Sequence, residues 1–99
     1  MKIEKIIIKD ITSGTLSNID GLTLKLAIDS ALNSSDIVML SFESISSISS
    51  SFLNSSIGEI IEKYGFEVLK NRIKITNYTS NLALFIKNYI ANLRYSEYI

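Results

Sequence analysis

Apolar residues along the chain form three short runs separated by stretches with helical spacing, and this pattern predicts three strands that each precede a helix. The first run, within Lys2–Lys9, contains three consecutive isoleucines, which are typical of a strand covered on both faces. The second, Ile37–Phe42, is almost continuously apolar and predicts the central strand. The third, Arg72–Thr76, alternates polar and apolar residues, which predicts a strand with one wet face near the sheet edge.

Between and after these runs, apolar residues recur at helical spacing. Each predicted helix begins at a residue that can cap its N-terminus: Ser17 or Asn18, one of Ser49–Ser51, and Thr79 or Ser80. The predicted buried stripes are Leu24, Ala27, Ile28, Ala31 and Leu32, then Leu53, Ile57, Ile60, Ile61 and Tyr64, then Leu82, Phe85, Ile86, Tyr89, Ile90 and Leu93. Gly65 stands where a left-handed cap would end the second helix, and Tyr95–Ile99 is expected to be a frayed tail.

The predicted order is β-α-β-α-β-α, in a single domain that spans residues 1–99. Short connections favour parallel strands with right-handed crossovers, so we predict a small α/β fold with a mixed, mainly parallel sheet of three to four strands and about three helices. Either Phe66–Leu69 or Ile11–Leu16 would supply a fourth, antiparallel strand. Gly58 lies inside the second predicted helix and indicates close packing against a neighbour.

The composition excludes most familiar enzyme chemistry. The 99 residues include no His and no Cys, so the chain cannot form an imidazole or thiolate metal site, a Cys nucleophile, a Ser-His-Asp triad or a disulfide. Asp36 and Glu43 flank the central strand without a companion nucleophile or metal ligand, and we interpret them as solvated carboxylates. We therefore expect no enzyme, no cofactor and no metal.

Charge and hydropathy argue against two further classes of protein, nucleic-acid binders and membrane-spanning proteins. Ten basic residues balance ten acidic ones, which argues against a nucleic-acid binder, and no apolar run approaches the roughly 18–20 residues of a membrane span. The first residues lack the apolar core of a signal peptide, so we expect a soluble cytoplasmic protein. Lys70, Arg72 and Lys74 form a small basic cluster, which we interpret as a solvated face, with contact to an acidic partner or a phosphate as the alternative.

The segment after the central strand, Glu43–Ser51, is the most informative part of the chain. It is polar except for Ile45 and Ile48, which we expect to close the edge of the core, and it delivers hydroxyl groups to the start of the second helix. Unpaired N–H groups and the helix dipole favour negative charge at such a start. A phosphate there would add nearly two negative charges without unfolding the domain.

The residues that we predict for phosphorylation or partner binding are Ser49, Ser50, Ser51, Phe52 and Asn54. Structural roles are the alternative for the first four. A single serine suffices to cap a helix, a contribution of about 1 kcal/mol, and Phe52 suits the core or a hydrophobic staple.

The central strand, the segment Ser44–Phe52 and the amphipathic helix that follows resemble the STAS-like domain family, relatives of the sulphate-transporter and anti-sigma factor antagonist domain. The resemblance runs from about Asp20 to Ile90. STAS domains begin the second helix with an Asp and a serine, and an anti-sigma kinase phosphorylates that serine; Ser49 and Ser50 occupy the matching positions. The resemblance thus implies a bacterial protein-interaction module that docks an ATP-binding, histidine-kinase-like regulator and is switched by phosphorylation of Ser50.

A constitutive structural or assembly subunit, used as a homo-oligomer or a complex component without phosphorylation, is the alternative function. Four tyrosines lie in the last quarter of the chain, and they indicate either late core or an interaction surface. They are Tyr78, Tyr89, Tyr95 and Tyr98. Dimerisation, or docking of a partner, through the last helix is therefore a second expectation.

Overall fold

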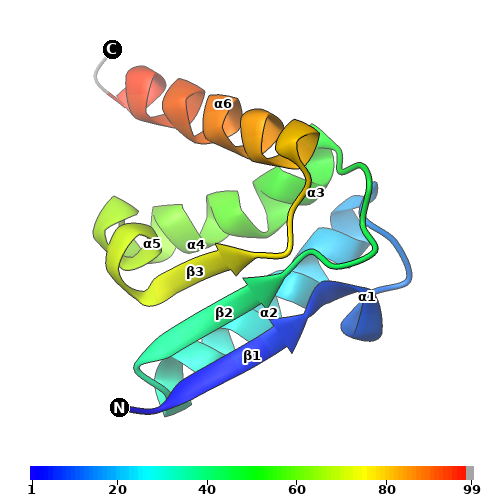
Figure 1. Ribbon diagram of the computed structural model, residues 1–99. Coiled ribbons are helices and arrows are strands. Elements are labelled where there is room, and N and C mark those ends of the chain that lie inside the picture. The colour runs from blue at the N-terminus through cyan, green and yellow to red at the C-terminus, as the bar shows by residue number, and fades with distance from the viewer. Residues whose placement is uncertain (98–99) are drawn as a thin grey trace.

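The computed structural model describes residues 1–97, and side-chain surroundings as far as residue 93. Its sheet consists of β1 (Ile3–Ile7), β2 (Ile37–Ser41) and β3 (Ile73–Thr76), in the order β1-β2-β3. Both strand pairs are parallel. The predicted α/β fold with a parallel sheet is confirmed, with β2 in the centre and β3 at an edge (Figure 1).

Six helical segments accompany the sheet within residues 1–97, more than the three that the pattern predicts. They are α1 (Ile8–Ile11), α2 (Asn18–Ser34), α3 (Ser50–Ser55), α4 (Ile57–Tyr64), α5 (Phe66–Arg72) and α6 (Ser80–Glu97). The predicted N-caps of α2 and α6 are confirmed. Ser17 Oγ accepts from the Asp20 N–H, and Thr79 Oγ1 accepts from the Leu82 N–H. The last helix continues through the first part of the expected frayed tail, and residues 98–99 lie outside the described residues.

Local hydrogen bonds explain two of the additional helices. Ile8, expected in the first strand, instead begins α1, and its carbonyl accepts from both the N–H and the hydroxyl of Thr12. The second predicted helix is divided at Ser56, whose backbone leaves helical geometry at φ −116° and ψ −90°. The buried Ser56 hydroxyl donates to the Phe52 carbonyl at 2.6 Å, and such bonding to the preceding turn bends helices.

No fourth strand is present among residues 1–97, and both candidate segments were wrong. Ile11–Leu16 is the end of α1 and a loop, and Phe66–Leu69 belongs to α5. Gly65 turns the chain at φ +89°, as its cap position predicts, and a new helix follows immediately. Arg72 anchors the end of α5, since its guanidinium donates to the carbonyls of Leu32, Ser35 and Asp36 at 2.8, 2.8 and 3.1 Å.

One face of the sheet carries the core. In Figure 1, α2 lies behind the strands, α3 and α4 appear above β3 and contact α2, and no helix lies in front of the strands within the described residues. The buried strand residues on the covered face are Ile6, Val38, Leu40 and Ile73. They pack with apolar residues of the predicted stripes, including Leu24, Ile28, Leu53, Ile57 and Ile60, which are fully buried. Ile45 and Ile48 are 9% and 8% exposed and close one end of the core, as predicted.

Two glycines allow helices to approach one another closely. A Cβ on Gly21 in α2 would stand 1.9 Å from Ser55 Oγ and 2.6 Å from the Phe52 carbonyl oxygen, so α3 rests directly on α2 at this point. A Cβ on Gly58 in α4 would stand 2.6 Å from Tyr89 Oη of α6, in agreement with the close packing predicted there.

A polar cluster joins α2 to α4 at the surface. The Asp29 carboxylate accepts hydrogen bonds from the Tyr64 hydroxyl and from Lys63 Nζ, the latter at 3.1 Å, and Lys25 Nζ lies 3.8 Å away. The Tyr64 hydrogen bond is the main cause that lowers the pKa of Asp29, with Lys63 and Lys25 acting in the same direction against partial burial. The same contact with Asp29 raises the pKa of Lys63. Within residues 1–97, no helix combines the length and apolar character needed to cross a bilayer.

Gly21→Ala is expected to lower the free energy of unfolding by about 1–3 kcal/mol, because the new methyl group overlaps backbone and side-chain atoms of α3. Gly58→Ala is the matched control, since its methyl group would stand 3.3 Å from the nearest backbone atom, the Leu53 carbonyl oxygen, and would otherwise meet the end of the Tyr89 side chain, while alanine favours the helix. Urea denaturation of both variants gives the comparison. Equal losses would contradict the assigned contact between α2 and α3.

Tyr64→Phe is expected to raise the pKa of Asp29, because the largest favourable contact of the carboxylate is removed. The pKa of Asp29 is lowered by folding, so its contribution to stability is complete above the unfolded value of about 3.9 and is lost as pH falls through the folded value. The stability difference between wild type and Tyr64→Phe should therefore shrink below pH ~4. Carboxyl NMR titration measures the pKa, and Tyr78→Phe, at an exposed tyrosine, is the control.

Candidate functional site

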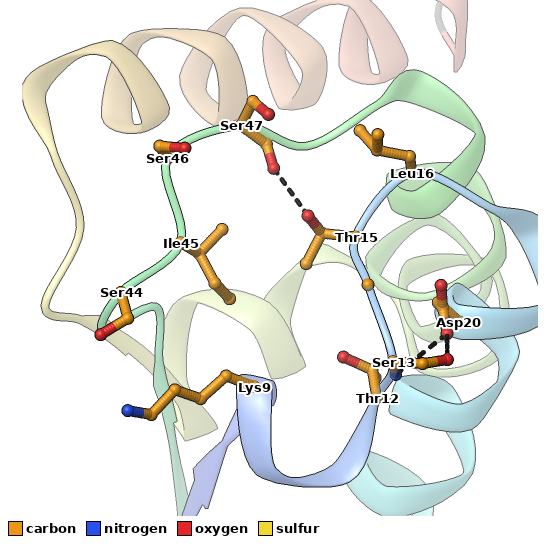
Figure 2. A pocket seen from close by; sticks show the side chains of 11 residues that line it. Lys9, Thr12, Ser13, Thr15, Leu16, Asp20, Ser44, Ile45, Ser46 and Ser47 are labelled. Carbon is orange, nitrogen blue, oxygen red and sulfur yellow. Dashed lines mark hydrogen bonds between the residues drawn. The ribbon is translucent and has the colours of Figure 1, made fainter.

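Two connections meet at the carboxyl end of the sheet, where ligand and partner sites of open α/β sheets commonly lie. One is the loop of residues 12–17 that precedes α2, and the other is the serine-rich loop of residues 42–49 that follows β2. Thr15 Oγ1 donates to the Ser47 carbonyl at 2.6 Å (Figure 2). The Ser49 N–H donates to the Thr15 carbonyl at 3.1 Å. Ser49 Oγ also donates to the Leu16 carbonyl at 2.8 Å. These bonds hold the serine-rich loop against the start of α2.

A groove of about 390 Å³ lies between the two loops. Its lining is rich in hydroxyl groups and includes Thr12, Ser13, Thr15, Ser44, Ser46 and Ser47, as Figure 2 shows. Both charged side chains of the lining already have partners. Lys9 Nζ lies 3.5 Å from Glu43 Oε2, and the Asp20 carboxylate accepts from the hydroxyls of Ser13 and Ser17.

Asp20 orders the residues on one side of the groove. Its own N–H donates to Ser17 Oγ while its carboxylate accepts from that hydroxyl, a reciprocal capping arrangement at the start of α2. The same carboxylate accepts from the backbone N–H and the hydroxyl of Ser13, at 3.3 and 3.1 Å. One side chain therefore fixes both the helix start and the loop before it.

The edge of the sheet beside the groove holds a second polar cluster. Ser41, at the end of β2, is fully buried, and its Oγ accepts from Asn77 Nδ2 at 2.8 Å and donates to the Glu43 carboxylate at 3.3 Å. Asn77 and Ser44 have positive φ angles of 56° and 63°, and no other described residue except Gly65 does. Positive φ angles are unfavourable for residues other than glycine, and such residues keep them where the surrounding contacts impose this conformation.

The five predicted site residues fall into different environments. Ser49 is half-buried and acts as the N-cap of α3, because its Oγ accepts from the Phe52 N–H at 3.0 Å. Ser50 and Ser51 are exposed in the first turn of α3, and neither hydroxyl has a hydrogen-bond partner among the described residues. The expected display of hydroxyl groups at this helix start is thus observed for two of the three serines.

Phe52 and Asn54 both serve the fold. Phe52 is fully buried in the core, so its ring is not available at the surface. Asn54 is exposed, and its Oδ1 accepts from the Tyr89 hydroxyl at 2.5 Å, which ties α3 to α6. Burial is the main cause that raises the pKa of Tyr89, with the charge of Glu59 adding to it, so the phenol stays protonated and able to donate.

An exposed apolar stripe along α2 was not predicted. Ile19, Leu22 and Leu26 follow one another at i, i+3 and i+7 and are 77%, 48% and 56% exposed. Leu16, whose carbonyl binds Ser49, extends the stripe and is 63% exposed. We call these four residues the α2 stripe. Contiguous apolar surface of this kind marks interaction sites, and the second apolar face of the helix was the signal that could have revealed it.

The described residues contain no group of three or more acidic side chains arranged to hold a metal ion. The tyrosines of the last quarter are divided: Tyr78 is 50% exposed, Tyr89 is half-buried against α4, and the surroundings of Tyr95 and Tyr98 lie outside the described side chains.

Ser49→Ala is expected to lower the free energy of unfolding by about 1 kcal/mol or somewhat more, because a helix cap and the link to Leu16 are both lost. Ser50→Ala, one residue later, should change it by less than about 0.5 kcal/mol, as expected for an exposed hydroxyl without a partner. Chemical denaturation measures both. A larger loss for Ser50→Ala would mean that the cap has been assigned to the wrong serine.

Comparison with known proteins agrees with this architecture. A family model described as a STAS-like domain of unknown function (DUF4325) matches residues 20–83, from the first turn of α2 to the first turn of α6, and thus more than half of the 99 residues. No curated protein and no solved structure matches the chain. The resemblance noted in the sequence is confirmed, and the chain belongs to the STAS-like domain family.

Proposed function

We propose that this domain is a non-catalytic interaction module of the bacterial cytoplasm, and that it docks an ATP-binding, kinase-like regulator of the anti-sigma type. The docking surface consists of the exposed serines at the start of α3, Asn54 beside them, and the α2 stripe. Phosphorylation of Ser50 ends the contact. Membership of the STAS-like family supports a protein-interaction fold, and the partner and the switch are our proposal.

The observation that carries the proposal is the position of two exposed hydroxyls without partners beside exposed apolar surface. Ser49, which caps the helix, is bonded to the Leu16 carbonyl, so the first residue of the α2 stripe adjoins the start of α3. A partner that covers the stripe would also cover Ser50. A phosphate there would place nearly two negative charges in an interface that excludes water, where an unpaired charge is costly.

The cap itself would survive this modification. The hydrogen bonds of Ser49 to Leu16 and Phe52 do not involve Ser50, whose side chain is exposed. Phosphorylation would therefore change the surface and leave the loop and the helix in place. That separation of a structural serine from a free one is what a reversible switch requires.

A constitutive assembly subunit is the second candidate, and the residue at position 49 favours it. The matching position of STAS domains is acidic, whereas Ser49 here is a neutral hydroxyl engaged in capping. In that case the α2 stripe would bind a larger protein, or a second copy, without control by phosphate. The two candidates share a surface and differ only in the role of Ser50.

Ser50→Asp is expected to weaken capture of an ATP-binding kinase-like protein from a lysate of the native cell at least tenfold, about 1.4 kcal/mol. Leu22→Asp should do the same, because it places a carboxylate in the α2 stripe. Asn88→Asp adds an equal charge on an exposed part of α6 and is the control. Quantitative mass spectrometry of the captured proteins gives the comparison.

Phosphorylation is tested separately by incubating the domain with the captured protein and ATP. A phosphate on Ser50 supports the switch. If Leu22→Asp abolishes capture while Ser50→Asp binds like wild type and no phosphate is found on Ser49–Ser51, the domain is a constitutive subunit. If neither variant affects capture, the proposed docking surface is wrong.

A further inference from the structure

The sheet has a second face that the helices leave open. At the carboxyl end of the sheet the register places Ser41 and Thr76 on this side, where Ser41 is buried and bonded to Glu43. Over the rest of this side it places Ile3, Lys5 and Ile7 of β1, Ile37 and Met39 of β2, and Lys74 of β3. In Figure 1 this is the face in front of the strands, with α2 behind them. We call these six residues the open face.

Much of the open face is apolar. Ile3 is 55% exposed, and Ile7, Ile37 and Met39 are only partly buried. Parallel sheets occur almost only with both faces covered, because their strands are apolar on both sides. An uncovered face of a parallel sheet with four large apolar residues is therefore typical of a surface that another protein segment covers.

The two charged strand residues of the open face, Lys5 and Lys74, are both basic, and the Glu43 carboxylate lies at the carboxyl end of the sheet, where it binds Ser41 and Lys9. Lys5, Met39 and Lys74 are direct neighbours across the three strands, so that one lysine stands on each side of the methionine. Among the described residues, neither lysine makes an ion pair, and the strands place no carboxylate on this face. Arg72, which the sequence groups with Lys70 and Lys74 in a solvated basic cluster, does not share this exposure, because its guanidinium donates to carbonyl groups.

A second copy of the chain does not complement this arrangement. When two open faces stack about a two-fold axis that passes through Met39, along or across the strands, a lysine on either side of Met39 meets a lysine of the other copy. Like charges in a partly desolvated interface are unfavourable. The occupant must instead combine apolar residues with acidic ones.

The dimensions of the open face suit one helix. Two strand spacings of about 4.8 Å place the Cα atoms of Lys5 and Lys74 roughly 10 Å apart, and a helix with its side chains is about 10–12 Å wide. The five residues of β2 extend over about 16 Å, which corresponds to roughly three helical turns.

We propose that the open face binds an amphipathic helix of a partner protein, whose apolar stripe lies on Ile37 and Met39 and whose flanking Asp or Glu residues pair with Lys5 and Lys74. This site is separate from the docking surface proposed above, because α2 stands between the sheet and the α2 stripe. It does not depend on Ser50, and the two partners could be bound together.

The probe is a synthetic 18-residue helix with leucines at i, i+3, i+4 and i+7 and glutamates on both flanks, compared with the same peptide carrying lysines on the flanks. With the full chain, amide NMR shifts caused by the glutamate peptide should centre on Ile3, Lys5, Met39 and Lys74. The lysine peptide should bind at least tenfold more weakly.

A charge reversal sharpens the test. The double variant Lys5→Glu, Lys74→Glu should lose the glutamate peptide and gain the lysine peptide, since only the sign of the flanking charges changes. Lys70→Glu with Lys87→Glu makes the same change of net charge on exposed parts of α5 and α6, and should bind like wild type.

Several results would overturn the proposal. Equal binding of the two peptides to the wild-type chain would remove the role of charge, and this comparison decides even if the double variant does not fold. Shifts centred on Ile19 and Leu22 would place the helix on the α2 stripe. A dimer in sedimentation that Met39→Asp dissociates would show that a second copy occupies the open face.

Discussion

The fold depends on both crossovers running in the same direction across the sheet. With the strand order β1-β2-β3 and right-handed connections, α2 and the group α3–α4–α5 must lie on the same face. Adjacent helices usually pack 8–10 Å apart, whereas adjacent strands are only about 4.8 Å apart, so two helices crowd above three strands. Gly21 relieves the crowding, because it allows the backbone of α3 to rest on α2. The whole core lies on that side, and the other face remains uncovered.

Elements that local sequence determines were predictable. Helix starts depend on side chains that bond to the next turn, as Ser17 and Thr79 do, and the central strand follows from an apolar run. The division at Ser56 and the helix α5 were not predictable from periodicity. Ser56 breaks the helix through a buried hydroxyl, and α5 is fixed by Arg72 contacts with α2, which the pattern of apolar residues does not contain.

The candidate site shows the same division. The positions of the serines at the start of α3 were predictable from capping preferences, but their separate roles depend on contacts with a distant loop. Thr15 and Leu16 lie 32 and 33 residues before their partners Ser47 and Ser49. These hydrogen bonds engage the Ser49 hydroxyl and the Ser47 carbonyl and do not involve Ser50. The apolar residues of the α2 stripe could be recognised in the sequence, but a prediction that assigns one buried apolar face to each helix omits them.

Arg72 has a consequence for how the domain assembles. Its guanidinium supplies hydrogen bonds to Leu32, Ser35 and Asp36, carbonyl groups at the end of α2 and just beyond it, from about 40 residues further along the chain. The Ala31 carbonyl has a local donor in Ser35, but the Leu32 carbonyl in the last turn of α2 is satisfied by Arg72, so this turn is not completed while the edge strand is detached. The end of α2 and the arrival of β3 are thus parts of one cooperative event, and a nascent chain that stops short of Arg72 would leave that terminus frayed.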